Sequence, residues 1–363
     1  MNKCVNIAKN IIWIDYAKFI GIFLVICMHT LGMLNLLDIG IYKHINGIVN
    51  LFYMPMFFVL AGYLYKDKGK SENYKKILWA LLIPYLLYQF LYLPFKLCTQ
   101  IFFHHLPIAD TILKDFCGIL IGDVQRYEEN SFFYSVCNPC YFIMVMIQIR
   151  FLFANVRITL KNSIIFSVLS FVILQILVIK DIDLYSCLDN TLYAIPFFII
   201  GYWIKYIKDN YIKENIQEFF KNNIVLILTS ALITLLLLLL YKINGFVVLA
   251  RVTYSITGHS ISIAYISAIL GTVVIIFLAN LFKTENAFVK TISKNTLFII
   301  YYHYWLIWVF KLLKLNKINI SDGGKTFIIY CILCLINLII CYFTIKVAEK
   351  YCPILLGKGL HKK

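Results

Sequence analysis

The sequence predicts an all-α, polytopic membrane protein with about ten transmembrane helices. Hydrophobic residues make up 61% of the 363 residues, the mean hydropathy is +0.81, and only 14% of the residues are charged. A soluble fold of this length does not bury so much apolar surface, whereas helices that cross a bilayer require it. Because no repeat or low-complexity linker divides the sequence, we expect a single membrane domain over residues 1–363.

Ten apolar windows are long enough to cross the bilayer, and each is expected to form a membrane-spanning segment. Their boundaries are placed to within a few residues. The windows cover approximately residues 12–34, 45–65, 77–99, 138–158, 163–180, 188–207, 222–241, 260–282, 294–312 and 326–347.

The distribution of lysine and arginine predicts that both termini face the cytosol. An even number of spans places the two ends on one side of the membrane. With the N-terminus inside, the inner segments carry about twice as many basic residues as the outer ones, as the positive-inside rule requires. The basic cluster at 311–325 runs against this trend.

The first window contains ionisable side chains at a spacing that indicates a functional site. Lys18 and His29 are eleven residues apart, close to three helical turns, so they share one helix face about 16 Å apart along the axis. Asp15 lies on the same stripe, and a local ion pair with Lys18 is a structural role that can hold together with a functional one. Ionisable groups inside membrane helices usually mark a reaction centre or a path. For His29 the structural alternative is an interhelical hydrogen bond.

Charge and cysteine usage argue against two other classes of protein. The net charge is +16, but the lysines are dispersed at the ends of apolar windows, which indicates anchoring against anionic lipid and no binding of nucleic acid. Eleven cysteines are scattered through the sequence and do not form a disulfide framework. Cys137 and Cys140 are spaced for either a disulfide or plain packing. No second Cys or His pair lies nearby with ligand spacing, so we predict no metal site.

Several segments, taken in order, resemble the integral-membrane acyltransferase-3 family, which O-acylates bacterial sugars. They cover nearly the whole chain, and each matches a segment of that family: IDYAKFIGIFLVICMH, FYMPMFFVLAGYLYK, YKKILWALLIPYLLY, NPCYFIMVM, PFFIIGYWIK and ISKNTLFIIYYHYWLI. Three positions depart from its pattern. Lys18 stands where arginine is commoner, Ala61 replaces the usual serine and Tyr141 the usual tryptophan. Lysine keeps the charge but lacks the bidentate fork of arginine.

The resemblance implies transfer of an acetyl group from acetyl-CoA to a sugar hydroxyl of a cell-surface polysaccharide or its lipid-linked precursor. Such a reaction needs a base for the hydroxyl proton, and His29 suits this role, either as base or as a nucleophile that forms an acyl-imidazole. Lys18 is expected to position the donor electrostatically. We further expect these two side chains to line one internal channel, so that a cytosolic thioester reaches the deeper histidine.

Two further groups of residues are candidate binding sites. Lys66, Lys75 and Lys76 belong to a predicted cytosolic cluster suited to the nucleotide end of acetyl-CoA, although the positive-inside signal alone also explains them. His303, Tyr302 and Trp305 lie in the ninth window, where aromatic rings suit a sugar acceptor; a packed, hydrogen-bonded His303 is the alternative.

The sequence thus favours a multi-pass O-acetyltransferase of the bacterial cytoplasmic membrane. Its partners are a glycan or lipid-linked sugar acceptor and membrane lipid. Two alternatives remain open: a transporter or flippase of lipid-linked sugars, in which the same ionisable residues line a path without reacting, and a polymerase of surface polysaccharide.

Overall fold

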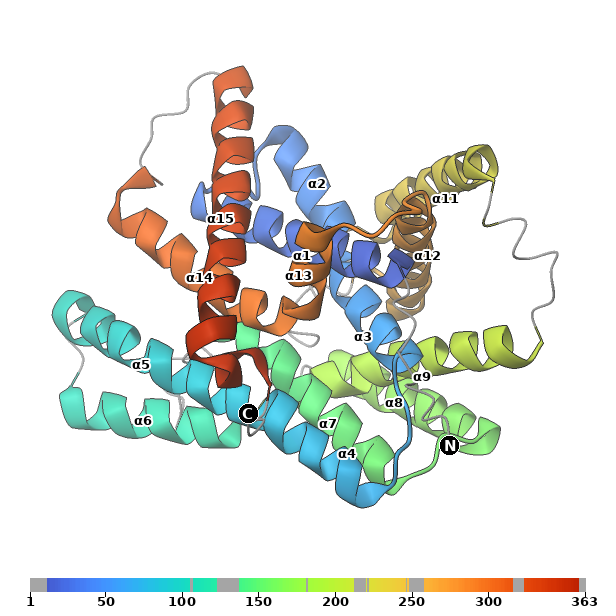
Figure 1. Cartoon of the computed structure of the whole chain (residues 1–363), viewed down its shortest axis with the longest axis horizontal. Coiled ribbons are helices and arrows are strands. Elements are labelled where there is room, and N and C mark those ends of the chain that lie inside the picture. The colour runs from blue at the N-terminus through green and yellow to red at the C-terminus, as the bar shows by residue number, and fades with distance from the viewer. Residues whose placement is uncertain are drawn as a thin grey trace, which may run out of the picture.

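The computed structural model describes residues 12–104, 107–122, 137–180, 182–211, 220, 222–245, 247, 258–315 and 323–358. This part of the chain is built from helices, as predicted (Figure 1). They are α1 (Ile12–Met33), α2 (Gly40–Asn50), α3 (Tyr53–Tyr63), α4 (Lys70–Ile77), α5 (Ile83–His104), α6 (Ile108–Ile121), α7 (Tyr141–Asn155), α8 (Leu160–Lys180), α9 (Leu188–Asn210), α11 (Asn223–Asn244), α12 (Ile261–Asn280), α13 (Ala287–Lys294), α14 (Thr296–Leu312) and α15 (Gly323–Tyr351).

The described helices account for all ten apolar windows. Eight segments are long and apolar enough to cross a membrane, and two shorter apolar helices, Tyr141–Asn155 and Thr296–Leu312, occupy the fourth and ninth windows. The chain is therefore a multi-pass membrane protein. Which side of the membrane each terminus faces stays a prediction.

Two of the windows are interrupted helices, and proline explains both interruptions. Pro55 has no N–H to donate to the carbonyl of Leu51, and the second window breaks there into α2 and α3. In the third window, a π-helical turn over Leu78–Leu82 joins α4 to α5 just before Pro84. The wider turn accommodates the missing N–H of the proline, and turns of this kind are frequent at functional sites.

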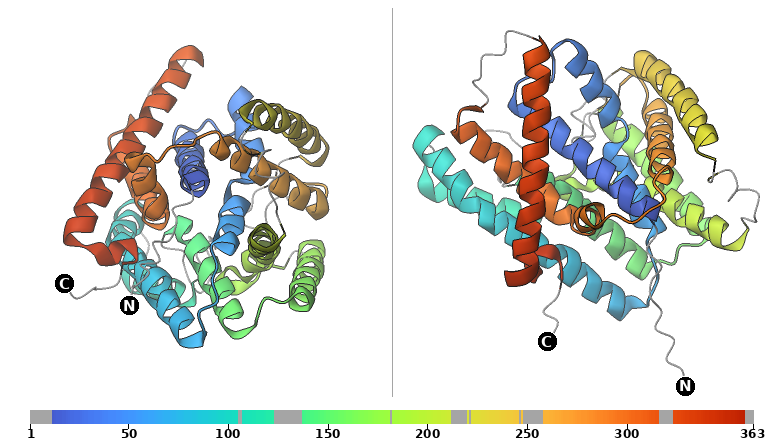
Figure 2. Two further views of the ribbon diagram at one scale, coloured as in Figure 1. Left: turned by 45° about the vertical axis from the view of Figure 1, so that its right-hand side comes forward. Right: turned by 45° about the horizontal axis from the view of Figure 1, so that its top comes forward.

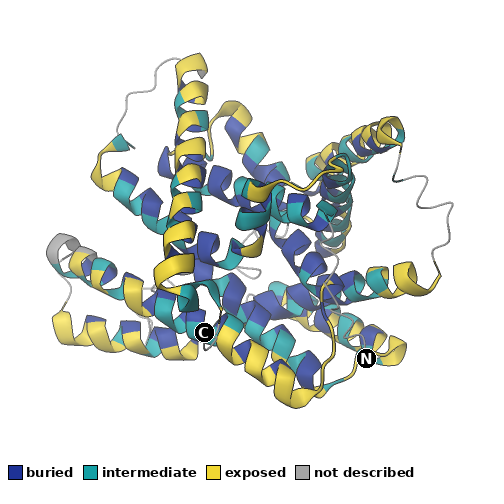
Figure 3. Ribbon diagram, in the orientation of Figure 1, coloured by how far each residue is buried: buried dark blue, intermediate teal, exposed yellow. Residues whose placement is uncertain are grey.

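The core lies around α1, α3 and α7, while α6, α11 and the outer side of α15 are largely exposed (Figure 3). In the views of Figure 2, α1 remains enclosed between α3, α12 and α13–α14. Large apolar side chains such as Leu232, Leu235 and Ile179 are exposed, as expected for surfaces that face lipid and not water.

Helix α6 was not anticipated, because it lies in the stretch predicted to connect the third and fourth windows. It packs beside α5 (Figure 1), and the Asp115 carboxylate accepts a hydrogen bond from the Lys96 ammonium at 2.5 Å. The side chains are 0% and 8% exposed. A lysine inside an apolar helix requires a partner, and α6 supplies it.

Cys137 and Cys140 are both buried and unbridged. Cys137 precedes and Cys140 ends a 3₁₀ turn, Asn138–Cys140, that leads into α7, and the Cys137 backbone N–H donates to the Gln89 side chain at 2.9 Å. Packing, not a disulfide, is therefore the role that the structure gives to this pair.

Helices α3 and α9 cross at two glycines that face each other's backbone. A Cβ on Gly62 would collide with the backbone carbonyl of Phe198, and a Cβ on Gly201 would collide with that of Val59. Small residues allow such close helix approach in membranes, where lipid removes the hydrophobic drive for association. This crossing holds the end of α3, and with it Tyr65, against α9.

Gly201→Ala is expected to destabilise the protein by about 1–3 kcal/mol, because the added methyl group has no space between the two backbones. Gly32→Ala is the matched control, since its Cβ would meet only the Leu37 side chain at 3.5 Å, an ordinary contact. Thermal unfolding of the detergent-solubilised variants measures both effects. Equal melting temperatures for the two variants would contradict the close crossing.

Candidate functional site

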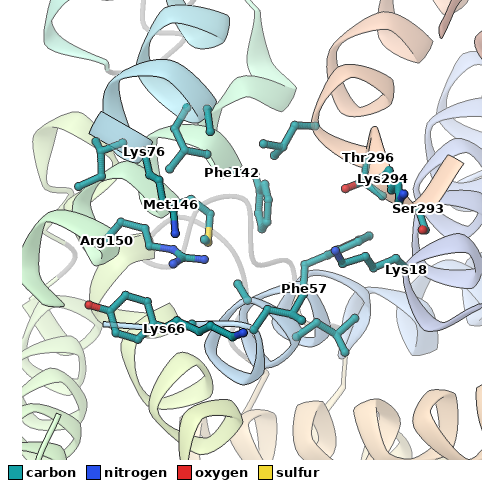
Figure 4. A pocket seen from close by; sticks show the side chains of 18 of the residues that line it. Lys18, Phe57, Lys66, Lys76, Phe142, Met146, Arg150, Ser293, Lys294 and Thr296 are labelled. Atoms are coloured by element: carbon teal, nitrogen blue, oxygen red, sulfur yellow. The ribbon is translucent and has the colours of Figure 1, made fainter. Parts of the chain in front are cut away.

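A cavity of about 460 Å³ opens among α1, α3, the α4–π segment, α7 and the α13–α14 junction (Figure 4). Its lining combines apolar and basic side chains: Lys18, Phe57, Leu60, Ala61, Leu64, Tyr65, Lys66, Asn73, Lys76, Ile77, Ala80, Leu81, Phe142, Met146, Arg150, Ser293, Lys294, Thr296 and Leu297. This size and mixture are typical of sites for small molecules.

The lining of the cavity is cationic. Its charged members are Lys18, Lys66, Lys76, Arg150 and Lys294, and none of its described lining residues is acidic. Figure 4 shows Lys66, Lys76 and Arg150 on one side of the space, and Lys18 and Lys294 on the other. Like charges that converge on a partly enclosed space repel one another, so the arrangement favours a bound anion with several charges.

Within the described part of the chain, Lys76 is the one cation of this set that lies within ion-pair distance of a carboxylate. The Lys76 ammonium lies 3.7 Å from the Glu72 carboxylate, which makes its shorter ion pair, at 2.8 Å, with Lys68. Both side chains are about half exposed, 50% for Lys76 and 48% for Glu72, and of the two only Lys76 lines the cavity. Such solvent-exposed pairs are weak and leave Lys76 able to bind a ligand.

Arg150 is held by aromatic rings instead of by a carboxylate. Its guanidinium carbon lies 5.1 Å from the ring centroid of Tyr65 and 5.6 Å from that of Phe198. The Tyr65 hydroxyl donates to the Phe153 carbonyl at 2.7 Å, which fixes the ring. Cation–π contacts hold the guanidinium plane and leave its N–H groups directed to a ligand.

Lys18 lines the cavity from α1 without an ion pair to Asp15, although the structure describes both residues. The Asp15 carboxylate instead accepts a hydrogen bond from the Ser293 hydroxyl at 2.5 Å. The local ion pair considered from the sequence is thus replaced by a tie between α1 and α13, and the Lys18 ammonium remains directed into the cavity.

The structure brings together three of the predicted donor-site residues, Lys18, Lys66 and Lys76. Lys75 is not among the lining residues and is exposed on another side of α4. Arg150 and Lys294 also line the cavity, and neither was a candidate site residue from the sequence. For Arg150 a signal was present: it lies within the apolar stretch MVMIQIRFLFA, where a charge usually has a function.

His29 and His303 pair in a second place, deeper along α1 and α14. Their ring centroids are 5.0 Å apart at an interplanar angle of 54°, and the Tyr304 ring is 5.6 Å from His29. His303 is 0% exposed, whereas His29 is partly exposed. Neither is among the lining residues of the basic cavity, so this cavity contains Lys18 but does not extend to His29, and a common channel for the two stays a prediction.

The two places are nevertheless connected by the same pair of helical segments. Lys18 shares the cavity with residues of the α13–α14 junction, and three turns further along α1, His29 faces His303 of α14. Phe57 lines the cavity and packs against Gly21, between Lys18 and His29 along α1. Its ring also meets Phe142, with centroids 5.8 Å apart. Phe57 thus lies between the cavity and the histidines along α1.

His303 is fixed from two directions. Its Nδ1 lies 2.6 Å from the Ile299 carbonyl, and its own backbone carbonyl accepts a hydrogen bond from the Asn337 side chain of α15 at 3.3 Å. Its Nε2 is buried and has no hydrogen-bond partner in the described part of the structure.

Tyr302 and Trp305 stack along α14, with centroids 5.8 Å apart. Tyr302 also stacks on Phe298 at 5.3 Å, and Trp305 meets Phe95 of α5 edge to face at 5.6 Å. Their nearest rings are therefore aromatic residues of α5 and α14. Binding of a sugar by Tyr302, Trp305 and His303 stays a prediction.

Comparison with known proteins gives one match. The model of the acyltransferase-3 family, described as an acyltransferase domain, matches residues 11–346, nearly the whole chain. No curated protein and no solved structure matches the chain. The matched range contains all of the cavity-lining residues and both paired histidines.

We expect tripolyphosphate to bind in the cavity and to raise the melting temperature of the purified protein. Arg150→Gln is expected to weaken this binding about tenfold, as loss of a charge-assisted contact does. Arg157→Gln, seven residues further and exposed outside the cavity, is expected to leave binding unchanged. Equal effects of the two variants would show that the anion binds elsewhere.

Proposed function

Because the chain belongs to the acyltransferase-3 family and is a membrane acyltransferase, we propose that it moves an acetyl group from acetyl-CoA to a sugar hydroxyl. The acceptor is a bacterial cell-surface polysaccharide or its lipid-linked precursor. The observation that carries this proposal is that α1 and α13–α14 line a cationic cavity with no acidic group among its described lining residues and, further along, carry a pair of histidines.

The donor fits the charge of the cavity. The phosphate groups of CoA match five cationic side chains, and a 460 Å³ space accommodates the nucleotide end while the pantetheine arm extends beyond it. The lysines at the mouth come from segments that the charge distribution predicts on the cytosolic side. In a bacterial cytoplasmic membrane, this is the side on which acetyl-CoA is available.

The reaction requires the C–S bond of the thioester to break and a C–O bond to the sugar to form. His29, partly exposed beside Tyr304, takes the hydroxyl proton as the oxygen attacks, and the proton then passes to the departing CoA thiolate. Attack by His29 itself, through an acyl-imidazole that the sugar hydroxyl then cleaves, is the second route. Either way, the thioester has to pass Phe57 to reach His29.

His29→Ala is expected to lower acetyl transfer by about three orders of magnitude, within the range that general-base catalysis contributes. The assay follows labelled acetyl groups from acetyl-CoA to glycan in proteoliposomes. His44→Gln, at an exposed position of α2, is the control and should retain wild-type activity. Normal transfer by a well-expressed His29→Ala protein would refute the assignment. Glycan that crosses the bilayer without acquiring label would favour a transporter.

Lys76→Gln is expected to raise the KM for acetyl-CoA about tenfold and to leave kcat nearly unchanged, because it removes a contact made equally in the ground and transition states. Lys75→Gln removes the same charge from the neighbouring position of α4, outside the cavity. It should therefore change KM by less than about twofold. If Lys75→Gln raises KM as much as Lys76→Gln, the donor recognises the charge of the whole segment and not this cavity.

A further inference from the structure

The hydrogen bonding of His303 determines which of its ring nitrogens carries the proton. Nδ1 lies 2.6 Å from the Ile299 carbonyl, and because a carbonyl only accepts, Nδ1 must be the donor. In a neutral imidazole, Nε2 then has a free lone pair. That atom is enclosed in the protein, with no partner among the described residues. A buried acceptor without a donor costs free energy, so its retention calls for an explanation.

The only ring nitrogens described beside His303 belong to His29. The centroid separation of 5.0 Å matches two imidazoles joined by an N–H···N bond of about 3 Å, whose centroids lie about 5 Å apart. The rings are tilted by 54° and are not hydrogen-bonded in this structure. A rotation of the His29 side chain would bring one of its N–H groups to Nε2 of His303.

Exposure distinguishes the roles of the two rings. His303 is 0% exposed and anchored through Ile299 and Asn337, so it cannot meet a sugar hydroxyl without rearrangement. His29 is partly exposed and has no hydrogen-bond partner among the described side chains. A base that is held by a third group, itself fixed by the fold, is the usual arrangement for an activated side chain.

We propose that His303 is the positioning residue of His29: its Nε2 accepts the N–H of one His29 ring nitrogen, which leaves the other nitrogen free to take the acceptor's proton. His303 remains neutral throughout, and the proton taken by His29 is the one passed to the CoA thiolate. This inference rests on the proposed function, because it assigns a partner to the same base. It also explains why a fully buried imidazole that is held through Nδ1 leaves its Nε2 without a partner among the described residues.

Paired substitutions of His303 separate this role from packing. His303→Gln places an amide group near the position of Nε2, whereas His303→Asn reaches only as far as Nδ1. We expect His303→Asn to lower kcat about 100-fold, as misorientation of a base does, with the KM for acetyl-CoA unchanged within about threefold. His303→Gln should retain kcat within about tenfold of wild type. Similar kcat values for the two variants, or a His303→Asn enzyme as fast as wild type, would overturn the proposal.

A measurement without turnover keeps this test separate from that of the acetyl transfer itself. In nanodiscs with ¹⁵N-labelled histidine, the signals that His303→Asn removes should report a protonated Nδ1 and an unprotonated, hydrogen-bonded Nε2. The His29→Gln variant should shift that Nε2 signal. A protonated Nε2, or a signal that is indifferent to His29, would overturn the pairing even if acetyl transfer is confirmed. Failure of transfer with the pairing intact would refute only the proposed function.

Discussion

Unbalanced positive charge is the constraint on which the site depends. Helices that pack mostly apolar surfaces bring five cationic side chains to one cavity whose described lining has no acid. The cost of such repulsion is limited because Lys66, Lys76 and Lys294 remain exposed at the mouth, whereas Lys18 and Arg150 are only partly so. A bound polyanion would remove the repulsion, because its negative charges neutralise the cationic side chains as it binds.

The same helices connect the cationic cavity to the pair of histidines. The close crossing of α3 and α9 at Gly62 and Gly201 sets Tyr65 and Phe198 around the Arg150 guanidinium. The Asp15–Ser293 hydrogen bond ties α1 to α13 at the cavity, and the His29–His303 pair joins α1 to α14 further along. In the proposed function, a donor bound at one end of α1 would extend along this helix towards the partly exposed His29 imidazole.

Much of the fold was predictable, because apolar length and composition alone identify a membrane-spanning helix. Each of the ten apolar windows predicted from the sequence is therefore occupied by helix in the structure. Proline at 55 and 84 explains where two of these helices are interrupted. Helix α6 was not predicted, because its role depends on a contact between separate segments: it brings Asp115 to the buried Lys96.

For the site, the sequence supplied the eleven-residue spacing that drew attention to Lys18 and His29. It could not show that Lys76 faces the cavity and Lys75 does not, since adjacent residues on a helix differ only by rotation. The pairing of His29 with His303 joins positions far apart in the chain, and periodicity within one helix carries no information about it.

The central claim is that the cationic cavity binds the nucleotide end of the donor with its sulfur directed to the histidine pair. Electron cryomicroscopy of the protein in nanodiscs with CoA tests this most directly. The account predicts phosphate density between Lys18 and Arg150, and a pantetheine arm that passes Phe57 towards His29. Well-resolved CoA bound away from this cavity, or bound in it with the thiol directed away from His29, would contradict the account.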